Sequence, residues 1–403
     1  MDKKPNILIL GGGYGGFKVA IYLQKYLRTN KAQITLISKH DYHYQTTLLH
    51  KVAVGTYSAR KARIFYRKIL DSNKVTFIKD TILTINPENK QVFGERGCYS
   101  YDYLVIALGF MPNTFNIKGV DEFCYKLETL NSAIRLRNNI ESKFKDFADN
   151  PLDLRFIVCG SGFTGIEFAA ELGTQIDELC KICGIDRDLV KIICVSRGEQ
   201  ILPMFDCKDS NIAKEKMSKL GIEFVQGNVV ECKSDGVVIK NRLGELEEIK
   251  ANNIVWCAGV KGSSVISNSP NFEHKDSRIL VDEFLRVPKY HDIFVVGDSA
   301  ISMKRNILNA PTAQLANQMG SYVGRNLIKI IDKQELLKPF VFQHRGTVCS
   351  IGHTDGVGVV FNISISGEVA AFLKNFIENK WIFSIGGMVN VLKKGQFRFR
   401  SSN

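Results

Sequence analysis

The sequence predicts an α/β protein in which two similar strand-turn-helix units are followed by a separate C-terminal segment. Three observations carry this prediction: two glycine turns with the same spacing, a short apolar strand near 292–300 that ends in Gly-Asp, and a C-terminal stretch that is both apolar and basic. The length of 403 residues exceeds what one core usually supports, so we expect two or three domains.

The first unit is NILILGGGYGGFKVAIYLQKYL, in which an apolar strand runs into a glycine turn and an amphipathic helix. Gly11, Gly13 and Gly16 have the spacing G-x-G-x-x-G, and QITLIS follows as the second strand. Glycine at these positions allows a tight turn and brings a pyrophosphate close to the unpaired N–H groups of the helix N-terminus. This context predicts a Rossmann-like dinucleotide-binding unit.

The second unit repeats the pattern in LRFIVCGSGFTGIEFAAELG, with KIICVS as its following strand. Gly160, Gly162 and Gly165 have the same spacing, so the chain is expected to bind two dinucleotides. The alternative is a pair of glycine turns in doubly wound sheets that bind nothing.

A third motif distinguishes the two units. DIFVVGDSA resembles the second flavin motif of the two-dinucleotide-binding flavoproteins, in which an aspartate, here Asp298, accepts hydrogen bonds from the ribityl chain. YDYLVIALG and NIVWCAGV, which end at or next to Gly109 and Gly259, resemble the strands that close the two domains of that superfamily, although ALG and CAG depart from the usual ATG. The resemblance implies FAD in the first unit and NADPH or NADH in the second.

This order implies a discontinuous FAD domain at 1–115 and 278–338, interrupted by an NAD(P)H domain at 116–277, with a membrane-associating C-terminal region at 339–403. One departure lies at the end of QITLIS, where Ser38 replaces the acidic residue that usually contacts the adenosine ribose. Lys39 follows and is expected to meet the pyrophosphate or the adenosine end.

Composition narrows the class of protein further. The formal net charge of +13 favours phosphate-bearing partners, but no basic-aromatic module supports binding to nucleic acid, so none is expected. The first residues pass from charges directly into an apolar strand, so no secretory signal is expected, and the spacing of the ten cysteines indicates reduced thiols. Cys180 and Cys183 form a lone CxxC with no second pair, which we interpret as structural, and no metal site is expected.

Cysteine positions also bear on the electron acceptor. HDYHYQTTLLHKVAVGT, after the first unit, contains no cysteine, which excludes thiol-disulfide reduction at that position. A sulfide:quinone oxidoreductase is the closer alternative, with Cys159 and Cys349 as its only suitable thiols. Both lie in apolar strand patterns and are interpreted as core residues.

AQLANQ, at 313–318, matches the A-Q-x-A-x-Q pattern of type II NADH dehydrogenases. The resemblance runs from NILILGGGYGG to IGGMVNVLKKGQF, with DYHY, GFTGIEF, VGD, APTAQ and RGTV in the expected order. It implies a homodimeric, non-pumping NAD(P)H:quinone oxidoreductase. Such an enzyme passes hydride from the nicotinamide to flavin N5 and then two electrons to a membrane quinone. The resemblance to bacterial members favours menaquinone as that quinone. It also implies cofactor contacts at Gly15, Thr47, Ala313 and Phe163.

Two glutamines in this motif suit a quinone. Gln314 and Gln318 are four residues apart and therefore share a helix face, where neutral amides can donate to quinone carbonyls without the cost of burying a charge. Ala313 and Ala316 leave room for flat rings. The alternative is a solvated polar face.

Two charged residues are expected near the electron-transfer site. Glu167 falls in the first turn of the helix after the second glycine turn, and the resemblance gives it a role in nicotinamide contact or proton handling. The alternative is an acidic residue that favours a helix N-terminus. Lys374 is expected to be a cation on the quinone side.

The C-terminal sequence VAAFLKNFIENKWIFSIGGMVNVLKKGQFRFR predicts a membrane-surface helix. Phe372, Leu373, Phe376, Ile377 and Phe383 form one face, and Lys374, Asn375, Glu378 and Asn379 form the other. Lys393, Lys394, Arg398 and Arg400 add positive charge for anionic head groups. Gly386 and Gly387 break a stretch already too short to span, so we expect peripheral attachment at the cytoplasmic face. A dimer interface or a core-packing helix is the alternative.

Nucleotide preference depends on KIICVSRGEQIL. An NADH-selective unit normally ends this strand in Asp or Glu, but here Ser196 and Arg197 occupy the position. Without a repelling carboxylate, the serine and the guanidinium can bind a 2'-phosphate, so the sequence predicts good use of NADPH, up to preference over NADH. If Glu199 instead accepts from the adenosine ribose in place of the missing carboxylate, the preference for NADH is restored. The alternative function of a nucleotide-sensing flavoprotein that does not turn over quinone is also left open.

Overall fold

The structure, a computed structural model, describes residues 4–302 and 311–397, and its chain groups into two compact units. Unit 1 consists of Met1–Gln45, Arg63–Met111 and Val260–His344, and unit 2 of Thr46–Ala62, Pro112–Gly259 and Arg345–Asn403. The C-terminal segment and the short segment Thr46–Ala62 therefore group with the second glycine turn. The α/β prediction is confirmed, whereas the functional domain boundaries stay predictions.

Unit 1 is built on a six-stranded sheet in the order β22-β23-β9-β1-β2-β5. Its strands are β1 (Asn6–Leu10), β2 (Gln33–Ser38), β5 (Thr76–Lys79), β9 (Tyr103–Ile106), β22 (Arg286–Val287) and β23 (Tyr290–Val295). Neighbours are parallel except for the antiparallel pair β22 and β23. The central strand β1 is buried from Ile7 to Leu10, as its unbroken apolar run predicts for a strand covered on both faces.

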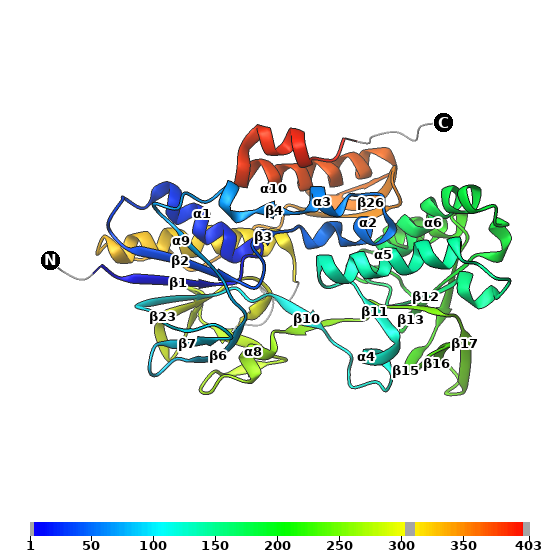
Figure 1. The fold of residues 1–403 in the computed structure, drawn as a ribbon, viewed down its shortest axis with the longest axis horizontal. Coiled ribbons are helices and arrows are strands. Elements are labelled where there is room, and N and C mark those ends of the chain that lie inside the picture. The colour runs from blue at the N-terminus through cyan, green and yellow to red at the C-terminus, as the bar shows by residue number, and fades with distance from the viewer. Residues whose placement is uncertain (1–3, 303–310, 398–403) are drawn as a thin grey trace. The chain divides into compact units, whose positions relative to one another are not determined.

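Two helices, α1 (Tyr14–Tyr26) and α9 (Ala313–Ile331), pack against each other in unit 1 (Figure 1). Glycines make the close approach possible: a methyl group on Gly320 would lie 2.5 Å from the main-chain oxygen of Gly15. α9 also contacts η5 (Gly297–Ser299), where a methyl group on Gly297 would lie 3.3 Å from the Ala316 Cβ. This packing holds the turn that carries Asp298 against the start of α9.

Unit 2 is built on a five-stranded parallel sheet in the order β11-β18-β12-β13-β14. Its strands are β11 (Cys124–Lys126), β12 (Arg155–Cys159), β13 (Lys191–Ser196), β14 (Ile222–Gln226) and β18 (Asn253–Trp256). Its main helices are α5 (Leu130–Lys145), α6 (Phe163–Cys183) and α7 (Cys207–Lys219). An antiparallel sheet of β15 (Asn228–Lys233), β16 (Gly236–Lys240) and β17 (Leu246–Lys250) adds to this unit.

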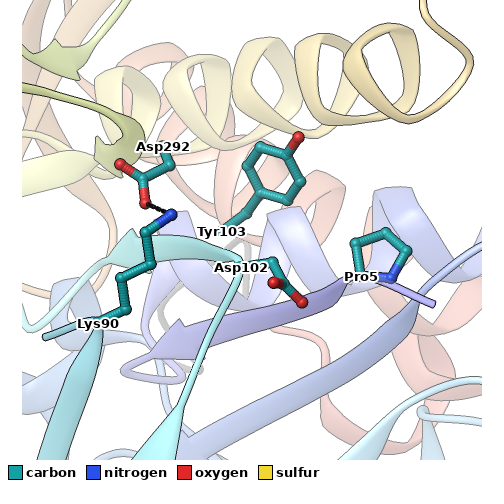
Figure 2. A pocket seen from close by; sticks show the side chains of 5 residues that line it. All are labelled: Pro5, Lys90, Asp102, Tyr103 and Asp292. Carbon is teal, nitrogen blue, oxygen red and sulfur yellow. Dashed lines mark ion pairs between the residues drawn. The ribbon is translucent and has the colours of Figure 1, made fainter. Parts of the chain in front are cut away.

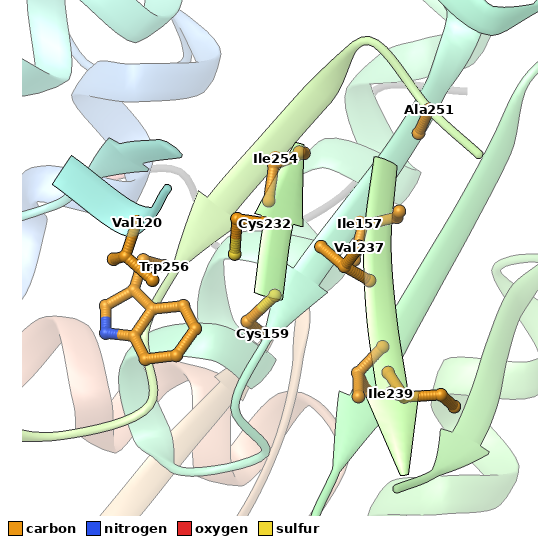
Figure 3. Close-up of a cluster of buried hydrophobic side chains, with 10 residues drawn as sticks. Val120, Ile157, Cys159, Cys232, Val237, Ile239, Ala251, Ile254 and Trp256 are labelled. Carbon is orange, nitrogen blue, oxygen red and sulfur yellow. The ribbon is translucent and has the colours of Figure 1, made fainter. Parts of the chain in front are cut away.

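A buried cluster joins these two sheets of unit 2 (Figure 3). Trp256 of β18 and Cys159 of β12 pack with Cys232 of β15 and Val237 of β16. Trp256, the last residue of β18, also donates from Nε1 to the main-chain oxygen of Asn113 at 2.9 Å. The antiparallel sheet is thereby fixed to the parallel sheet that carries the second glycine turn.

The C-terminal part of unit 2 consists of an antiparallel sheet, β25 (Gly346–Ile351), β26 (Asp355–Val360) and β27 (Ile363–Ser366), and the helix α10 (Glu368–Lys394). α10 is kinked at Gly387, whose φ of 67° lies in the left-handed region. Over the two ranges that the structure describes, none of the helices combines the length and the apolar character needed to cross a bilayer.

The remaining elements are short. They are β3 (Tyr42–His43), η1 (Thr46–Leu48), α2 (Leu49–Val54), α3 (Ala59–Ala62), β4 (Ile64–Phe65), η2 (Tyr66–Lys68), β6 (Ile82–Asn86), β7 (Gln91–Gly94), β8 (Cys98–Ser100), β10 (Phe110–Pro112), α4 (Val120–Phe123), η3 (Pro151–Leu154), η4 (Arg187–Leu189), β19 (Val260–Gly262), α8 (Ser264–Ser267), β20 (His274–Lys275), β21 (Arg278–Val281) and β24 (Ala300–Ser302).

Candidate active site

The first glycine turn has the geometry of an anion-binding loop. Gly11 has a φ of 96°, and a methyl group there would lie 2.2 Å from the main-chain oxygen of Ala107. A methyl group on Gly16 would lie 2.1 Å from the oxygen of Gly11, whereas Gly13 faces open space. The outer two glycines thus close the turn on β1 and β9, and the middle one, which caps α1, leaves room for a phosphate.

Gly12, inside this turn, has a main-chain oxygen that is bound from two sides. The Tyr66 hydroxyl donates to it at 2.8 Å, and His43 Nδ1 lies 3.0 Å from it. Burial lowers the pKa of His43 to about 4, so the ring is neutral and Nδ1 is assigned as the donor. These contacts hold the Gly12 carbonyl in place, and the sequence did not indicate them.

The second strand of unit 1 ends as predicted. Ser38 closes β2 and hydrogen-bonds the Tyr66 hydroxyl, and Lys39 is exposed. Gly109 follows β9 with a φ of 73°, and its N–H donates to the buried Ser299 hydroxyl at 3.0 Å. Thr47 lies in η1, which belongs to unit 2, so it is not grouped with the other predicted flavin contacts.

Asp298 lies in η5, directly after β23 and one residue beyond the positive-φ Gly297. Its carboxylate is half-buried, and no residue in the described ranges hydrogen-bonds its oxygens, although Arg278 donates to its main-chain oxygen at 3.0 Å. Burial raises its pKa to about 6, and the charge of Arg278 only partly opposes this shift. A carboxylate in this state suits hydroxyl donors such as those of a ribityl chain.

The glutamine motif begins α9 as predicted. Thr312 caps the helix by accepting from the N–H of Leu315 at 3.1 Å, and Ala313 and Gln314 occupy its first turn, both half-buried. Ala316 is buried against Gly297, so its small size is explained by packing and not by room for a ring. Ala310, the first residue of APTAQ, lies outside the described residues.

Gln318 makes a reciprocal pair of hydrogen bonds with the main chain of Gln343. Its Nε2 donates to the Gln343 oxygen at 2.8 Å, and its Oε1 accepts from the Gln343 N–H at 3.0 Å. A side-chain amide has two donor hydrogens and two acceptor lone pairs, so one of each is left for a further partner. The contact was not expected, because nothing local in the sequence relates the two residues.

The second glycine turn repeats the first one within unit 2. A methyl group on Gly160 would lie 2.6 Å from the oxygen of Cys257, one on Gly165 would lie 2.0 Å from the oxygen of Gly160, and Gly162 faces open space. Phe163 begins α6 and packs edge-on against Phe205, with ring centroids 5.4 Å apart. Gly259 accepts from the N–H of Asn113 at 2.9 Å at the end of the β18 strand.

The predicted nucleotide-selecting residues end β13. Ser196 is buried, its hydroxyl donates to the oxygen of Gly198 at 2.8 Å, and it lies 2.6 Å from the Ser161 hydroxyl. Arg197 is exposed, and so is Glu199, whose Oε2 lies 3.2 Å from Arg242 Nη2. Glu199 is therefore an ion-paired residue in this structure.

Glu167 corrects the expectation from sequence. It is the fifth residue of α6, past the first turn, and the first turn contains no acidic residue, so attraction to the helix N-terminus does not explain it. The side chain is buried, and its Oε1 accepts from the N–H and the hydroxyl of Ser350, both at 3.0 Å. Lys374 Nζ lies 2.8 Å from the same oxygen.

The charges in this group stabilise one another. Burial alone would raise the pKa of Glu167, but the charge of Lys374 and the hydrogen bonds from Lys374 and Ser350 hold it below its usual range. Burial alone would lower the pKa of Lys374, but the charges of Glu167 and Glu378 raise it above its usual value. Burial lowers the pKa of His50 to about 4, so this ring is neutral beside the pair, with Nδ1 3.7 Å from Glu167 Oε2.

A second layer of buried polar side chains extends from Lys374. Glu378 Oε1 lies 3.9 Å from Lys374 Nζ, and its other oxygen accepts from Gln396. Lys51 Nζ donates to Gln396 Oε1 at 2.5 Å and to Asn375 Oδ1 at 3.2 Å. No local pattern in the sequence indicated Lys51, His50 or Ser350. The i, i+4 spacing of Lys374 and Glu378 was visible, but it does not say which helix face is buried.

The face of α10 that carries Lys374, Asn375 and Glu378 is thus buried, and apolar residues such as Trp381 and Ile382 are buried with it. The face that carries the phenylalanines lies outside. Phe372, Phe376 and Phe383 are 48%, 53% and 53% exposed, and Met388, Val389 and Leu392 are exposed as well. A core-packing role for this apolar face is therefore excluded. Lys394 Nζ donates to the oxygen of Lys61, which brings the basic end of α10 to α3. Arg398 and Arg400 lie outside the described residues.

The two cysteines considered for sulfide chemistry are core residues, as predicted. Cys159 ends β12 and Cys349 lies in β25, with 1% and 0% of their surfaces exposed. Burial raises the pKa of both thiols well above the usual range, which disfavours the reactive thiolate.

One pocket in unit 1 lies away from these residues (Figure 2). Pro5, Lys90, Asp102, Tyr103 and Asp292 line it. Pro5 and Asp102 precede β1 and β9, so the pocket lies at the strand ends opposite the first glycine turn. Lys90 and Asp292 form an ion pair across it at 2.7 Å. Ligands of such sheets bind at the carboxyl ends of strands, so this pocket is not part of the site.

Comparisons with known proteins cover nearly the whole chain. Residues 5–319 match the family described as pyridine nucleotide-disulphide oxidoreductase. The chain is 38% identical over 404 residues to a type II NADH:quinone oxidoreductase of Staphylococcus saprophyticus, covering 98% of this chain and 99% of that protein. A protein of the same description from Staphylococcus aureus strain MSSA476 is 39% identical, with the same coverage. The solved structure of NDH2 from Plasmodium falciparum in complex with NADH has a TM-score of 0.87 at 20% identity, covering 97% of this chain and 98% of that one.

Proposed function

This chain belongs to the type II NADH:quinone oxidoreductases of the pyridine nucleotide-disulphide oxidoreductase family, and from that premise we propose how its own residues hold FAD, the nicotinamide nucleotide and the quinone. It is a flavoprotein enzyme that oxidises NADH with a quinone. The observation that carries the finer proposal is the pair of glycine turns, each closed by its outer glycines and open at the middle one.

FAD is assigned to unit 1. The open Gly13 and the bare N-terminus of α1, which lacks any acidic residue in its first turn, fit the pyrophosphate. Asp298 fits the ribityl hydroxyls, because its half-buried carboxylate has no donor among the described residues. Gly11, Gly15, Gly16, Ser38, Lys39, Gly109 and Ala313 complete the proposed set in unit 1. Thr47, which groups with unit 2, is proposed as a further contact of FAD. Bound FAD supplies the two-electron relay between nicotinamide and quinone, and the protein orients both partners.

The quinone is assigned to the face of α9 that carries the half-buried Gln314 and Gln318. Gln318 and Gln314 offer neutral amides, and Gln318 keeps a free N–H while it holds Gln343. A neutral donor suits a quinone carbonyl in an apolar slot, because no charge has to be buried. We propose menaquinone as the physiological acceptor, from the bacterial relatives.

Glu167 and Lys374 are proposed to handle a proton during turnover. Both are buried and oppositely charged, and they are 2.8 Å apart, which allows a proton to pass between them when the charge of a neighbouring group changes. Ser350 holds the carboxylate in place through two hydrogen bonds. Lys374 thus acts as the quinone-side cation and Glu167 as its partner.

The nicotinamide nucleotide is assigned to unit 2, on Gly160, Gly162, Phe163, Gly165 and Gly259. We propose that NADPH is accepted well, up to preference over NADH, because β13 ends in Ser196 and an exposed Arg197 where NADH-selective units place a carboxylate. No like charge then repels a 2'-phosphate, and the guanidinium offers a charge-assisted contact.

Attachment to the membrane is proposed through α10. Its exposed aromatic face suits the acyl boundary, and Lys393 and Lys394 at its end suit anionic head groups. We place the enzyme on the cytoplasmic face of the membrane as a peripheral homodimer.

Two measurements test this set of assignments. Flavin released by heat is expected to be FAD by mass spectrometry, and FMN would contradict the unit 1 assignment. The ratio of kcat/KM for NADPH to that for NADH is expected to fall in Ser196→Glu/Arg197→Ala by roughly one to two orders of magnitude, since charge-assisted contacts contribute about 1.5 to 3 kcal/mol. Strong NADH selectivity in the natural protein would defeat the NADPH assignment.

A further inference from the structure

A second arginine lies beside the nucleotide-selecting end of β13. Arg242 is in the turn between β16 and β17, far in sequence from Ser196. Its Nε donates to Gln226 Oε1, and Gln226 is the register partner of Ser196 in the pairing of β13 with β14. Gln226 Nε2 in turn donates to the main-chain oxygen of Arg197 at 3.3 Å. One glutamine side chain thus ties Arg242 to the strand end that carries Ser196 and Arg197.

The same guanidinium also neutralises an acidic residue at this edge. Arg242 Nη2 lies 3.2 Å from Glu199 Oε2, and Glu199 is two residues beyond Arg197. An unpaired carboxylate here would accept from an adenosine 2'-hydroxyl and repel a 2'-phosphate, which favours NADH. Because Arg242 pairs with Glu199, this edge carries two guanidiniums and one carboxylate, a net positive charge.

Resting on the proposed use of NADPH, we propose that Arg242 is a specificity-determining residue that works in two ways. It cancels the charge of Glu199, and it supplies a second cation for the 2'-phosphate of NADPH. The side chains of Arg242 and Glu199 are 57% and 79% exposed, and exposed ion pairs of this kind stabilise a protein little. The guanidinium can therefore turn from the carboxylate to a phosphate, which presents more acceptor oxygens in a geometry that arginine binds well.

The opposing roles of Arg242 and Glu199 predict opposite effects on selectivity. Arg242→Ala removes a cation and exposes the Glu199 carboxylate, so it weakens binding of the 2'-phosphate. Arg242→Ala/Glu199→Gln removes both charges, so it recovers part of that binding. Arg242→Lys keeps the charge but loses the planar fork, so it retains only part of the preference.

The experiment measures binding without turnover. Isothermal titration calorimetry of the flavin-loaded, full-length protein compares adenosine 2',5'-bisphosphate with adenosine 5'-monophosphate as probes. In the natural protein we expect the bisphosphate to bind more tightly than the monophosphate. Arg242→Ala should reduce that preference by about three- to tenfold, which is the effect of losing one charge-assisted contact that is weakened by solvent exposure. Arg135→Ala on α5 removes the same charge from an exposed helix position away from β13 and β14, and is expected to leave the preference unchanged.

The outcomes separate this inference from the proposed NADPH use. If the natural protein binds both probes equally, the NADPH assignment itself fails. If it prefers the bisphosphate and Arg197→Ala abolishes the preference but Arg242→Ala does not change it, the assignment stands and the role of Arg242 is overturned. An equal loss in Arg135→Ala also overturns that role, because overall charge then explains the effect.

Discussion

The Lys374 ammonium lies 2.8 Å from Oε1 of Glu167, and both side chains are buried in unit 2. The two residues come from different elements, α10 and α6, so their charges connect the C-terminal helix to the helix that follows the second glycine turn. A buried charge is stable only when it is paired and hydrogen-bonded, which this pair achieves with the help of Ser350.

Removing one partner is expected to destabilise unit 2. Lys374→Met keeps a long side chain but leaves the Glu167 carboxylate without its cation, so the free energy of unfolding at pH 7 should fall by about 3–5 kcal/mol. Chemical denaturation followed by circular dichroism measures this change. Lys374→Met/Glu167→Gln removes both charges and should recover part of the loss, and an unchanged single variant would show that the pair does not stabilise the fold.

Glu167 is also expected to affect turnover. Glu167→Gln keeps the size of the side chain and its acceptor oxygen for Ser350 but removes the carboxylate that pairs with Lys374, so kcat should fall and the pH profile of kcat should change. Steady-state assays across pH measure both. Normal turnover with an unchanged profile would reduce Glu167 to a structural role.

His50 predicts a pH dependence of stability. Its pKa is about 4 in the folded protein, below the ordinary value of 6.5, so the folded state binds fewer protons than the unfolded state. The stability that this difference contributes is fully present above 6.5 and is lost as the pH falls from 6.5 towards about 4. His50→Gln should therefore lose less stability than the natural protein between pH 7 and pH 4, by up to roughly 3 kcal/mol. The exposed His274→Gln serves as the control, and identical slopes in all three proteins would contradict the prediction.

Gln318 can be tested for two separate roles. Gln318→Leu removes every polar contact, whereas Gln318→Glu keeps an acceptor for the Gln343 N–H and loses the donor. If the amide donates to the quinone, both variants should raise the quinone KM while flavin reduction by the nucleotide, followed by stopped-flow absorbance, stays intact. If Gln318→Glu behaves like the natural protein, the amide only holds Gln343 in place.

The exposed face of α10 gives the sharpest test of membrane attachment. Truncation at residue 370 would also remove Lys374 and Glu378, which are buried, so point substitutions on the outer face are preferable. Phe372→Asp/Phe376→Asp/Phe383→Asp should move the protein from sedimented anionic vesicles to the supernatant and lower activity with long-chain quinones most. Leu243→Asp changes a residue that is 82% exposed elsewhere in unit 2, and it should leave vesicle binding unchanged. Retained binding in the triple variant would contradict the anchor.

Local patterns predicted the glycine turns and their flanking strands, because a strand, a G-x-G-x-x-G turn and a helix form a unit within a short stretch of chain. β1, β12, α1 and α6 are found where the sequence placed them. Asp298 was predicted for the same reason, since an apolar strand ending in Gly-Asp is a local signal.

Contacts between distant segments could not be predicted in this way. His50 and Ser350 meet Glu167 only because α2, α6 and β25 are brought together in unit 2. The periodicity of α10 separated its two faces correctly, but the burial of Lys374 depends on Glu167, more than two hundred residues earlier in the chain. The predicted position of Glu167 in the first turn of the helix was wrong, because α6 begins at Phe163, directly after the glycine turn.

The most direct test of the central claim is an anaerobic two-step titration of the purified protein. The visible flavin absorbance is expected to bleach on addition of NADPH or NADH and to return when a soluble naphthoquinone is added in the absence of oxygen. A protein whose flavin is not bleached by either nucleotide, or is bleached and then stays reduced in the presence of the quinone, would contradict the account.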